Sequence, residues 1–349
     1  MIKNKRKPFF ILFSVLYWIL AALYFITIRY AAPGIFTPPD LHYAKLLAYG
    51  SAVGSSIGLL FGLFPINRLL HFNKRRSFLS VLLICTGCYI LFFILIIFLT
   101  SLYGNTFSFA FAYVFSPDGL TVLFHLSVCS LFYHFILQIN KKFGPGVLLE
   151  YTLGRYFTPK EESRAFMFID LKSSTSIAES LEHVTYSRMV QDYYAELTIP
   201  LIRYRAQVYQ YVGDEVVVSW KINRFFSASA CIDFLYAFRE RIALRKEYFL
   251  QQYGVCPEFK AGLHCGKVTV AEVGEIKTEI AYHGDVLNTA SRIQSLCNSL
   301  QKEFLISEAF LHLLPEEKRD EAVFVANVEL RGKEVKTRIF TVTRTTFKL

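Results

Sequence analysis

The first 140 residues contain four long apolar runs separated by short polar segments. The runs are Phe9 to Ile28, Leu46 to Leu63, Phe78 to Leu99, and Leu120 to Ile139. An α-helix needs about 20 mainly apolar residues to cross the hydrocarbon core of a bilayer. The pattern predicts a bundle of four transmembrane helices over residues 1–142, with the lipid bilayer as its partner.

The rest of the chain mixes charged and apolar positions at the periods of packed helices and strands. This alternation predicts an α+β domain over residues 164–349 with a mainly antiparallel sheet. One apolar helical stripe is expected to cover a sheet face: Tyr186, Met189, Val190, Tyr193 and Leu197. The strands are expected near 165–171, 206–212, 215–220 and 258–271, and the helices near 174–198, 224–248 and 286–298.

Residues 143–163 connect the two parts. Pro145 and Pro159, together with three glycines, interrupt any continuous helix here. The segment is also too apolar for a solvated tether. It is predicted to be a jointed connector that packs against other parts of the protein.

Composition supports this division and gives the membrane half an orientation. A hydrophobic content of 53% and a mean hydropathy of +0.35 exclude a single soluble domain. The net charge of +10 comes largely from clusters that flank the apolar runs, so it predicts topology rather than nucleic-acid binding. Both termini and the second domain are expected on the cytoplasmic side of the inner membrane. The clusters are Lys3, Lys5, Arg6 and Lys7; Arg68, Lys74, Arg75 and Arg76; Lys141 and Lys142.

Two features of the apolar runs allow more than one interpretation. Glycine recurs at every fourth position from Gly50 to Gly62, which predicts a groove for close helix packing, either within one bundle or between two chains. His125 and His134 lie in the fourth run, where a polar ring is a functional candidate. Cofactor (haem) ligation, proton sensing and a hydrogen bond to a neighbouring helix remain open for them.

The first candidate for chemistry is the apolar run A-F-M-F-I-D-L, which ends in Asp170. A polar turn follows, and a capping box of Ser176 and Glu179 predicts the start of a helix. Backbone N–H groups around Ser173, Ser174 and Thr175 could hold phosphates there, while Asp170 binds a metal ion. The alternative is an aspartate that only caps the helix.

Two further elements carry polar groups at informative places. The sequence V-Y-Q-Y-V-G-D-E-V predicts a hairpin with Asp214 at its tip, where a second carboxylate beside Asp170 would suit a two-metal site. Downstream, Asn288 and Arg292 stand four residues apart on one face of an amphipathic helix. They could orient a ribose and neutralise phosphoryl charge, or form an ordinary solvated face.

Four blocks occur together in order: F-I-D-L-K-S-S-T, Y-V-G-D-E, A-G-L-H-C-G-K-V and H-G-D-V-L-N-T-A-S-R. Over about residues 155–345 the chain resembles the class III adenylate and guanylate cyclase catalytic domain. The resemblance implies a ferredoxin-like, palm-type βαββαβ core. It also implies conversion of ATP or GTP into a 3′,5′-cyclic monophosphate, with Mg²⁺ or Mn²⁺ as cofactor at two ions per site.

The resemblance also assigns roles to single residues. Asp170, the backbone carbonyl of Leu171 and Asp214 would bind the metal ions, and Asn288 and Arg292 would act on the ribose and the transition state. Family sites form between two catalytic domains, one giving the metal acids and the other the Asn and Arg, so a homodimer is expected. Positions implied to bind substrate are Lys260, Gln210, Ala281, Ser173, Ser174, Thr175 and Lys333.

The identity of the substrate is less clear from these positions. Gln210 and Ala281 stand where the family reads the purine base, and they match neither the adenine nor the guanine pattern. Because Gln210 can both donate and accept hydrogen bonds, it suits either purine. ATP is the expected substrate, and guanylate cyclase is the alternative. A diguanylate cyclase is disfavoured because the hairpin lacks its doubled glycine and Phe. A catalytically inactive membrane receptor is disfavoured because both acids, the Asn and the Arg are present.

Overall fold

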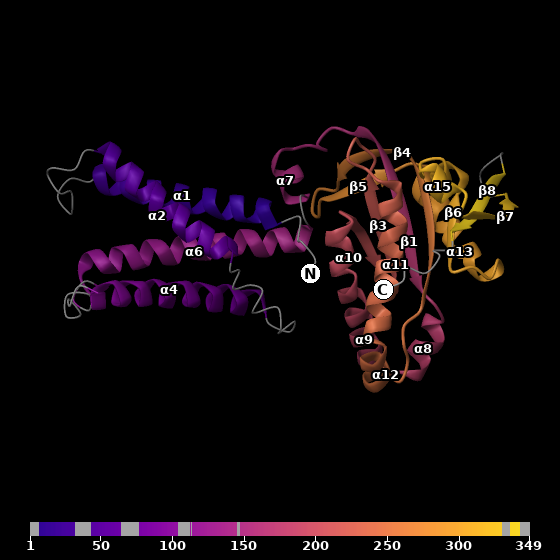
Figure 1. Ribbon diagram of the computed structural model, residues 1–349, viewed down its shortest axis with the longest axis horizontal. Helices are drawn as coiled ribbons and strands as arrows, with labels where there is room; N and C mark the ends of the chain where they lie inside the picture. Colours follow the sequence, from indigo (N-terminus) through magenta and orange to yellow (C-terminus); the bar gives the residue numbers. More distant parts are fainter. Residues whose placement is uncertain are drawn as a thin grey trace. The chain divides into compact units, whose positions relative to one another are not determined.

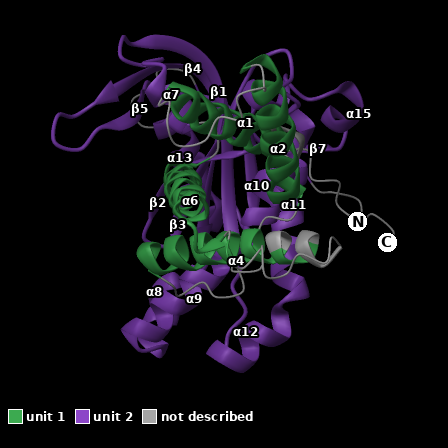
Figure 2. Ribbon diagram, turned by 90° about the vertical axis from the view of Figure 1, so that its left-hand side faces the viewer, with its two compact units in different colours: residues 1–145 green, residues 146–349 purple. Residues whose placement is uncertain are grey.

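The computed structural model describes residues 7–31, 43–63, 77–103, 112, 114–144, 147–329 and 336–342. The chain divides into two compact units, residues 1–145 and 146–349 (Figure 2). The division falls at Pro145, inside the predicted connector.

The first unit contains four helices that are long and apolar enough to cross a membrane. They confirm the four predicted spans, including the last. Their bounds are α1 (Lys7–Ala31), α2 (Tyr43–Leu63), α4 (Phe78–Tyr103) and α6 (Pro117–Phe143). The basic clusters before Lys7 and over residues 68–76 lie outside the described residues, whereas Lys141 and Lys142 occupy the last turn of α6.

The glycine repeat of α2 packs against α1 of the same chain. A Cβ atom added at Gly54 would lie 2.5 Å from the carbonyl oxygen of Trp18, and one at Gly58 would lie 2.7 Å from the carbonyl oxygen of Ser14. These separations are far inside van der Waals contact, so glycine is required for the two helices to approach this closely. The interpretation as packing within one bundle is therefore the one observed.

The two membrane histidines make hydrogen bonds inside the bundle. His125 Nε2 lies 3.1 Å from the carbonyl oxygen of Ala21 on α1, which is the neighbouring-helix contact considered for it. His134 is buried, and its Nδ1 lies 3.0 Å from the carbonyl oxygen of Ser130 in the same helix.

The second unit is an α+β domain built on one mixed sheet with strand order β2-β3-β1-β4-β6-β8-β7, in which β5 also pairs with β4 (Figure 1). The β4–β6 pair is parallel and the other pairs are antiparallel, so the predicted architecture is confirmed. The strands are β1 (Lys160–Leu171), β2 (Gln207–Val212), β3 (Glu215–Lys221), β4 (Phe259–Val273), β5 (Glu279–His283), β6 (Phe304–Ser307), β7 (Ala322–Val328) and β8 (Thr337–Val342).

Helices cover both faces of this sheet. One face packs against α9 (His183–Glu196) and α11 (Ala228–Leu244); the predicted stripe is confirmed, because Met189, Tyr193 and Leu197 are buried in that core. Helix α13 (Asp285–Ser299) covers the other face. The remaining helices are α7 (Val147–Thr152), α8 (Ser174–Ser180), α10 (Thr198–Arg203), α12 (Lys246–Tyr253), α14 (Glu308–Leu311) and α15 (Glu316–Arg319).

Two glycines of β4 explain how closely α13 approaches the sheet. A Cβ atom at Gly262 would lie 2.6 Å from the Cα of Gln294, and one at Gly266 would lie 2.8 Å from Val286 Cγ2. Glycines four apart on a strand point to the same face. The A-G-L-H-C-G segment of β4 therefore forms the surface against which α13 packs.

Several element boundaries differ from the sequence predictions. The expected helix over 174–198 is three helices, because Leu181 turns extended and packs on the core. The expected capping box at Ser176 is wrong: α8 begins at Ser174, after Ser173 with φ 53°. The expected helix over 224–248 is α11 followed by α12. Strand β1 begins at Lys160, since it pairs with β4 from that residue onward.

Candidate active site

The two predicted metal acids lie at one end of the central strands. Asp170 is the penultimate residue of β1, and Asp214 lies in the β2–β3 turn, where Gly213 has a φ of 61°. Tyr194 on α9 supports this turn, because its hydroxyl donates to the Gly213 carbonyl at 3.0 Å. The predicted hairpin with an acid at its tip is present.

A third carboxylate, that of Glu215, lies near these two. Glu215, the first residue of β3, lies directly opposite Asp170 in the antiparallel pairing, so both side chains extend from the same sheet face. Burial, and then the charges of Asp170 and Asp214, raise the pKa of Glu215 to about 7. Burial also raises the pKa of Asp170, an effect that Lys260 partly offsets and Asp214 increases. This end of the sheet therefore favours a bound cation.

Two side chains hold Asp170 from the other side. Lys260 lies opposite it on β4, with its Nζ 3.2 Å from Asp170 Oδ2; their side chains are 13% and 22% exposed. The buried amide of Gln294 on α13 donates to the same oxygen at 3.1 Å. Lys260, assigned by resemblance to a phosphate, thus forms an ion pair with Asp170, one of the predicted metal ligands.

Asn288 and Arg292 lie on α13, exposed and half-buried respectively. Gln294 is about 200° around the helix axis from Arg292 at 100° per residue. Because Gln294 faces Asp170, the positions of Arg292 and Asn288, about 160° and 120° around the axis from Gln294, lie on other sides of α13.

Gln210 and Ala281 lie on β2 and β5, strands that are not hydrogen-bonded neighbours. Their sequence neighbours Tyr209 and Tyr282 bring the two strands together, with ring centroids 4.8 Å apart in an edge-to-face contact. Gln210 is exposed and Ala281 is half-buried.

The remaining predicted substrate positions divide into described and undescribed ones. Ser173 and Thr175 are exposed and Ser174 is half-buried, in the turn after Asp170. Leu171 follows Asp170 and has a buried side chain. Lys333 lies outside the described residues.

Comparison with known proteins identifies the family of this domain. Residues 158–343 match the model of the adenylate and guanylate cyclase catalytic domain, which is more than half of the chain. The chain belongs to this family.

Individual relatives agree with that assignment. The chain is 35% identical over 204 residues to "Adenylate cyclase 2" of Rhizobium meliloti (strain 1021), covering 58% of this chain and 55% of that protein. It is 31% identical over 75 residues to a photoactivated adenylate cyclase subunit beta-like protein of Euglena gracilis, covering 22% and 9%. The chain thus spans about half the length, or less, of these relatives.

A solved structure shows the same fold. The structure of a bacterial light-regulated adenylyl cyclase superposes with a TM-score of 0.55 at 15% identity, covering 66% of this chain and 67% of that one. At this identity the likeness concerns the fold alone.

Cyclase domains of this family use divalent metal ions, and the residues present fit such ions. Among the described residues, no group of three or more His, Cys, Asp and Glu side chains is arranged to hold a metal ion. Two carboxylates and a carbonyl leave most coordination positions to triphosphate oxygens and water, which is the usual arrangement for Mg²⁺. The crowded acids and the lysine already seated on Asp170 show that the site attracts cations.

Sequence reasoning did not find Gln294 or Glu215. Gln294 could have been noticed as a polar residue on the apolar face of α13, since Ile293 and Cys297 beside it are buried. Glu215 was overlooked because the adjacent Asp214 already supplied the acid of the turn. Only the strand register shows that Glu215 faces Asp170.

Proposed function

We propose that the chain is an adenylate cyclase that forms 3′,5′-cyclic AMP and pyrophosphate from ATP in a homodimer. The observation that carries the proposal is the convergence of Asp170 and Asp214 at one sheet end, beside Lys260. The preference for ATP is supported by the name of the Rhizobium relative. GTP remains the second candidate because the amide of Gln210 can pair with either purine.

The reaction exchanges one phosphorus–oxygen bond for another. The ribose 3′ oxygen bonds to the α-phosphorus, the bond to the β-phosphate bridging oxygen breaks, and the hydroxyl proton passes to solvent. Asp170, Asp214 and the Leu171 carbonyl would hold the divalent ions, whose charge would acidify the hydroxyl and stabilise the leaving pyrophosphate. Lys260 would neutralise negative charge on the triphosphate.

Asn288 and Arg292 act from the second subunit. Within one chain they lie on other sides of α13 from Gln294, which bonds to Asp170. In a two-fold dimer each site then takes the acids of one chain and the Asn and Arg of the other. Asn288 orients the ribose, and Arg292 stabilises charge that grows on the phosphoryl group. Ser173, Ser174 and Thr175, in the turn after Asp170, contact the triphosphate.

The test is a product assay with the full chain in detergent. ATP or GTP is supplied with Mg²⁺ or Mn²⁺, and products are resolved by mass spectrometry, beside Asp170→Ala and Asp214→Ala. The proposal expects cyclic AMP from the unchanged chain and none from either variant. Cyclic GMP as the main product would change the substrate, and equal activity in the variants would refute the site.

A further inference from the structure

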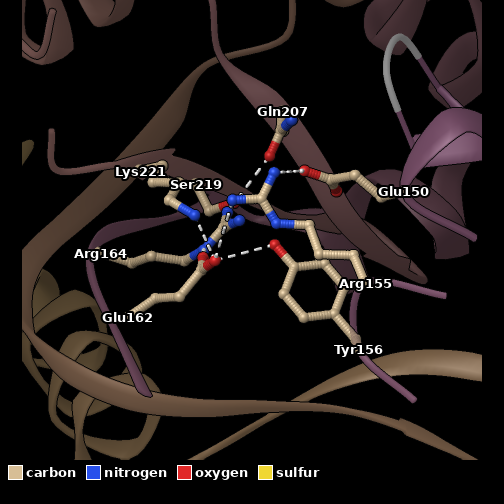
Figure 3. Close-up of polar contacts among 8 residues, drawn as sticks. All are labelled: Glu150, Arg155, Tyr156, Glu162, Arg164, Gln207, Ser219 and Lys221. Atoms are coloured by element: carbon tan, nitrogen blue, oxygen red, sulfur yellow. Dashed lines mark hydrogen bonds and ion pairs between the residues drawn. The ribbon is translucent and has the colours of Figure 1, made fainter. Parts of the chain in front are cut away.

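A second cluster of charged groups lies on the same sheet face as Asp170, at the far end of β1 (Figure 3). Its centre is the pair Glu162 and Arg164, whose side chains are 6% and 1% exposed. Arg164 Nε donates to Glu162 Oε2 at 3.0 Å, and Tyr156 Oη donates to Glu162 Oε1 at 2.9 Å. Lys221 Nζ also donates to this carboxylate. The proposed reaction uses none of these groups.

Arg164 fixes the two strands that carry Gln210 and Ala281. Its Nη1 donates to Gln207 Oε1 on β2 at 3.2 Å and to Ser219 Oγ on β3 at 3.3 Å. Its Cζ lies 4.7 Å from the ring centroid of Tyr282 on β5, a cation–π contact in a desolvated place. Tyr282 in turn packs against Tyr209, the neighbour of Gln210.

Tyr156 links the segment before β1 to this cluster. It is 2% exposed although it belongs to no strand or helix, and Glu272 N donates to its carbonyl at 2.9 Å. Nearby, Arg155 pairs with Glu150 of α7 at 3.5 Å. Tyr151 of α7 donates to the carbonyl of Thr278, just before β5, at 3.3 Å. Segment 150–156 is therefore built into the domain beside β4 and β5.

We propose that the buried Glu162–Arg164 pair positions the strands that read the purine base, and that Tyr156 connects segment 150–156 to this pair. These are positioning residues, because they act through Tyr282 and Tyr209 rather than on the nucleotide. The inference rests on the proposed function for the meaning of positions 210 and 281.

The position of the cluster predicts which kinetic constant it affects. Arg164 is six residues from Asp170 along β1, or about 20 Å at 3.3 Å per residue. Loosening the cluster should shift β5 and the Gln207 end of β2, while Asp170 stays in place and Tyr194 still holds the turn that carries Asp214. Binding of the base and the choice between purines should change, and the chemical step should change little.

Tyr156→Phe tests this with the smallest possible alteration, since it removes one hydroxyl that donates to Glu162. The matched control is Tyr248→Phe, which removes a hydroxyl that donates to Asp192 Oδ2 at 2.6 Å on the other side of the sheet. Both variants are prepared as full chains in detergent, and their melting temperatures show that each is folded.

Tyr156→Phe is expected to raise KM for ATP about threefold to tenfold, the effect of one buried hydrogen bond. It should also shift the ratio of kcat/KM for ATP over GTP, with kcat within about twofold. Tyr282→Leu removes the ring that Arg164 contacts and should shift the same ratio. The double variant should change the ratio by less than the product of the single effects, because both changes act on the Glu162–Arg164 pair.

The inference is overturned if Tyr156→Phe behaves like Tyr248→Phe, or if it lowers kcat without altering the purine ratio. Failure of the proposed function looks different, because the unchanged chain would then cyclise neither triphosphate. In that case equilibrium dialysis with labelled ATP and GTP still decides the inference: the ratio of the two Kd values must shift in Tyr156→Phe and stay constant in Tyr248→Phe.

Discussion

The two ends of one face of β1 carry charged groups in opposite states. At one end, Glu162 is buried and receives hydrogen bonds from Tyr156, Arg164 and Lys221. At the other, Asp170 faces Glu215 directly and feels Asp214, with Lys260 as the nearby cation. Removing one partner of a buried ion pair destabilises a fold, whereas crowded like charges destabilise it until a further cation binds. The comparison separates an end of the strand whose charges are paired from the end where we propose that metal ions bind.

Neutralising the acids at the Asp170 end should have the largest effect on activity. Asp170→Asn and Asp214→Asn should each lower cyclase activity by about 10³-fold, because the metal ions lose a carboxylate. The free energy of unfolding of Asp214→Asn in EDTA should rise by about 0.2–1 kcal/mol, since like-charge repulsion is relieved. Activity assays and denaturant titrations check both signs. If Asp214→Asn strongly lowered the free energy of unfolding, like-charge repulsion among the acids at this end would be contradicted.

Glu162→Gln should give the opposite pattern at the other end. Removing the carboxylate leaves Arg164 buried without its anion, so the free energy of unfolding should fall by about 3 kcal/mol at pH 7. Measurable activity should remain. Chemical denaturation of the full chain in detergent measures the change, and an unchanged stability would show that the pair contributes nothing.

The effect of Glu162→Gln should also depend on pH. Burial raises the pKa of Glu162, but Lys221, Arg164 and Tyr156 together outweigh it and leave the pKa below its usual value. A depressed carboxyl pKa gives stability that is present above the unfolded pKa and is lost as pH falls through the folded one. The difference between the two proteins should therefore narrow below about pH 4. A constant difference would exclude the ion pair as its origin.

Gly262→Ala should disturb α13, the helix that carries Asn288, Arg292 and Gln294. The added methyl would collide with the backbone of Gln294, so α13 must shift, at a cost of about 1–3 kcal/mol in unfolding free energy. The hydrogen bond from Gln294 to Asp170 should weaken with it. Gly87→Ala is the control, because a Cβ there has open space around it.

The smallest effect is expected from an exposed ion pair. Glu303 contacts Lys172 at 2.8 Å and Arg239, but its side chain is 49% exposed. Glu303→Gln should change the unfolding free energy by less than about 1 kcal/mol. If Glu303→Gln lowered the free energy of unfolding as much as Glu162→Gln, burial would not explain why the two ion pairs differ in strength.

These regions also show what sequence alone could predict. Asp170 was predicted at a strand tip because it ends an apolar run, and Asp214 at a hairpin tip because it lies between two β runs. The metal role of both acids came from the family resemblance. Strands β5 to β8 were not predicted, and β5 in particular was missed because Glu275, Lys277 and Glu279 make its surroundings look like a loop. Contacts set by register and helix rotation, such as Glu215 with Asp170 and Gln294 with Asp170, also stayed hidden. Such contacts depend on how elements pack, which local patterns do not specify.

The most direct test of the composite site mixes two inactive chains. Asp170→Ala retains Asn288 and Arg292, and Arg292→Ala retains both acids. If each site takes groups from two subunits, co-expressed variants should regain roughly a quarter of the unchanged activity, because half of the dimers have one intact site. Mixtures that stay as inactive as the single variants, although heterodimers are recovered by affinity tags, would contradict the account.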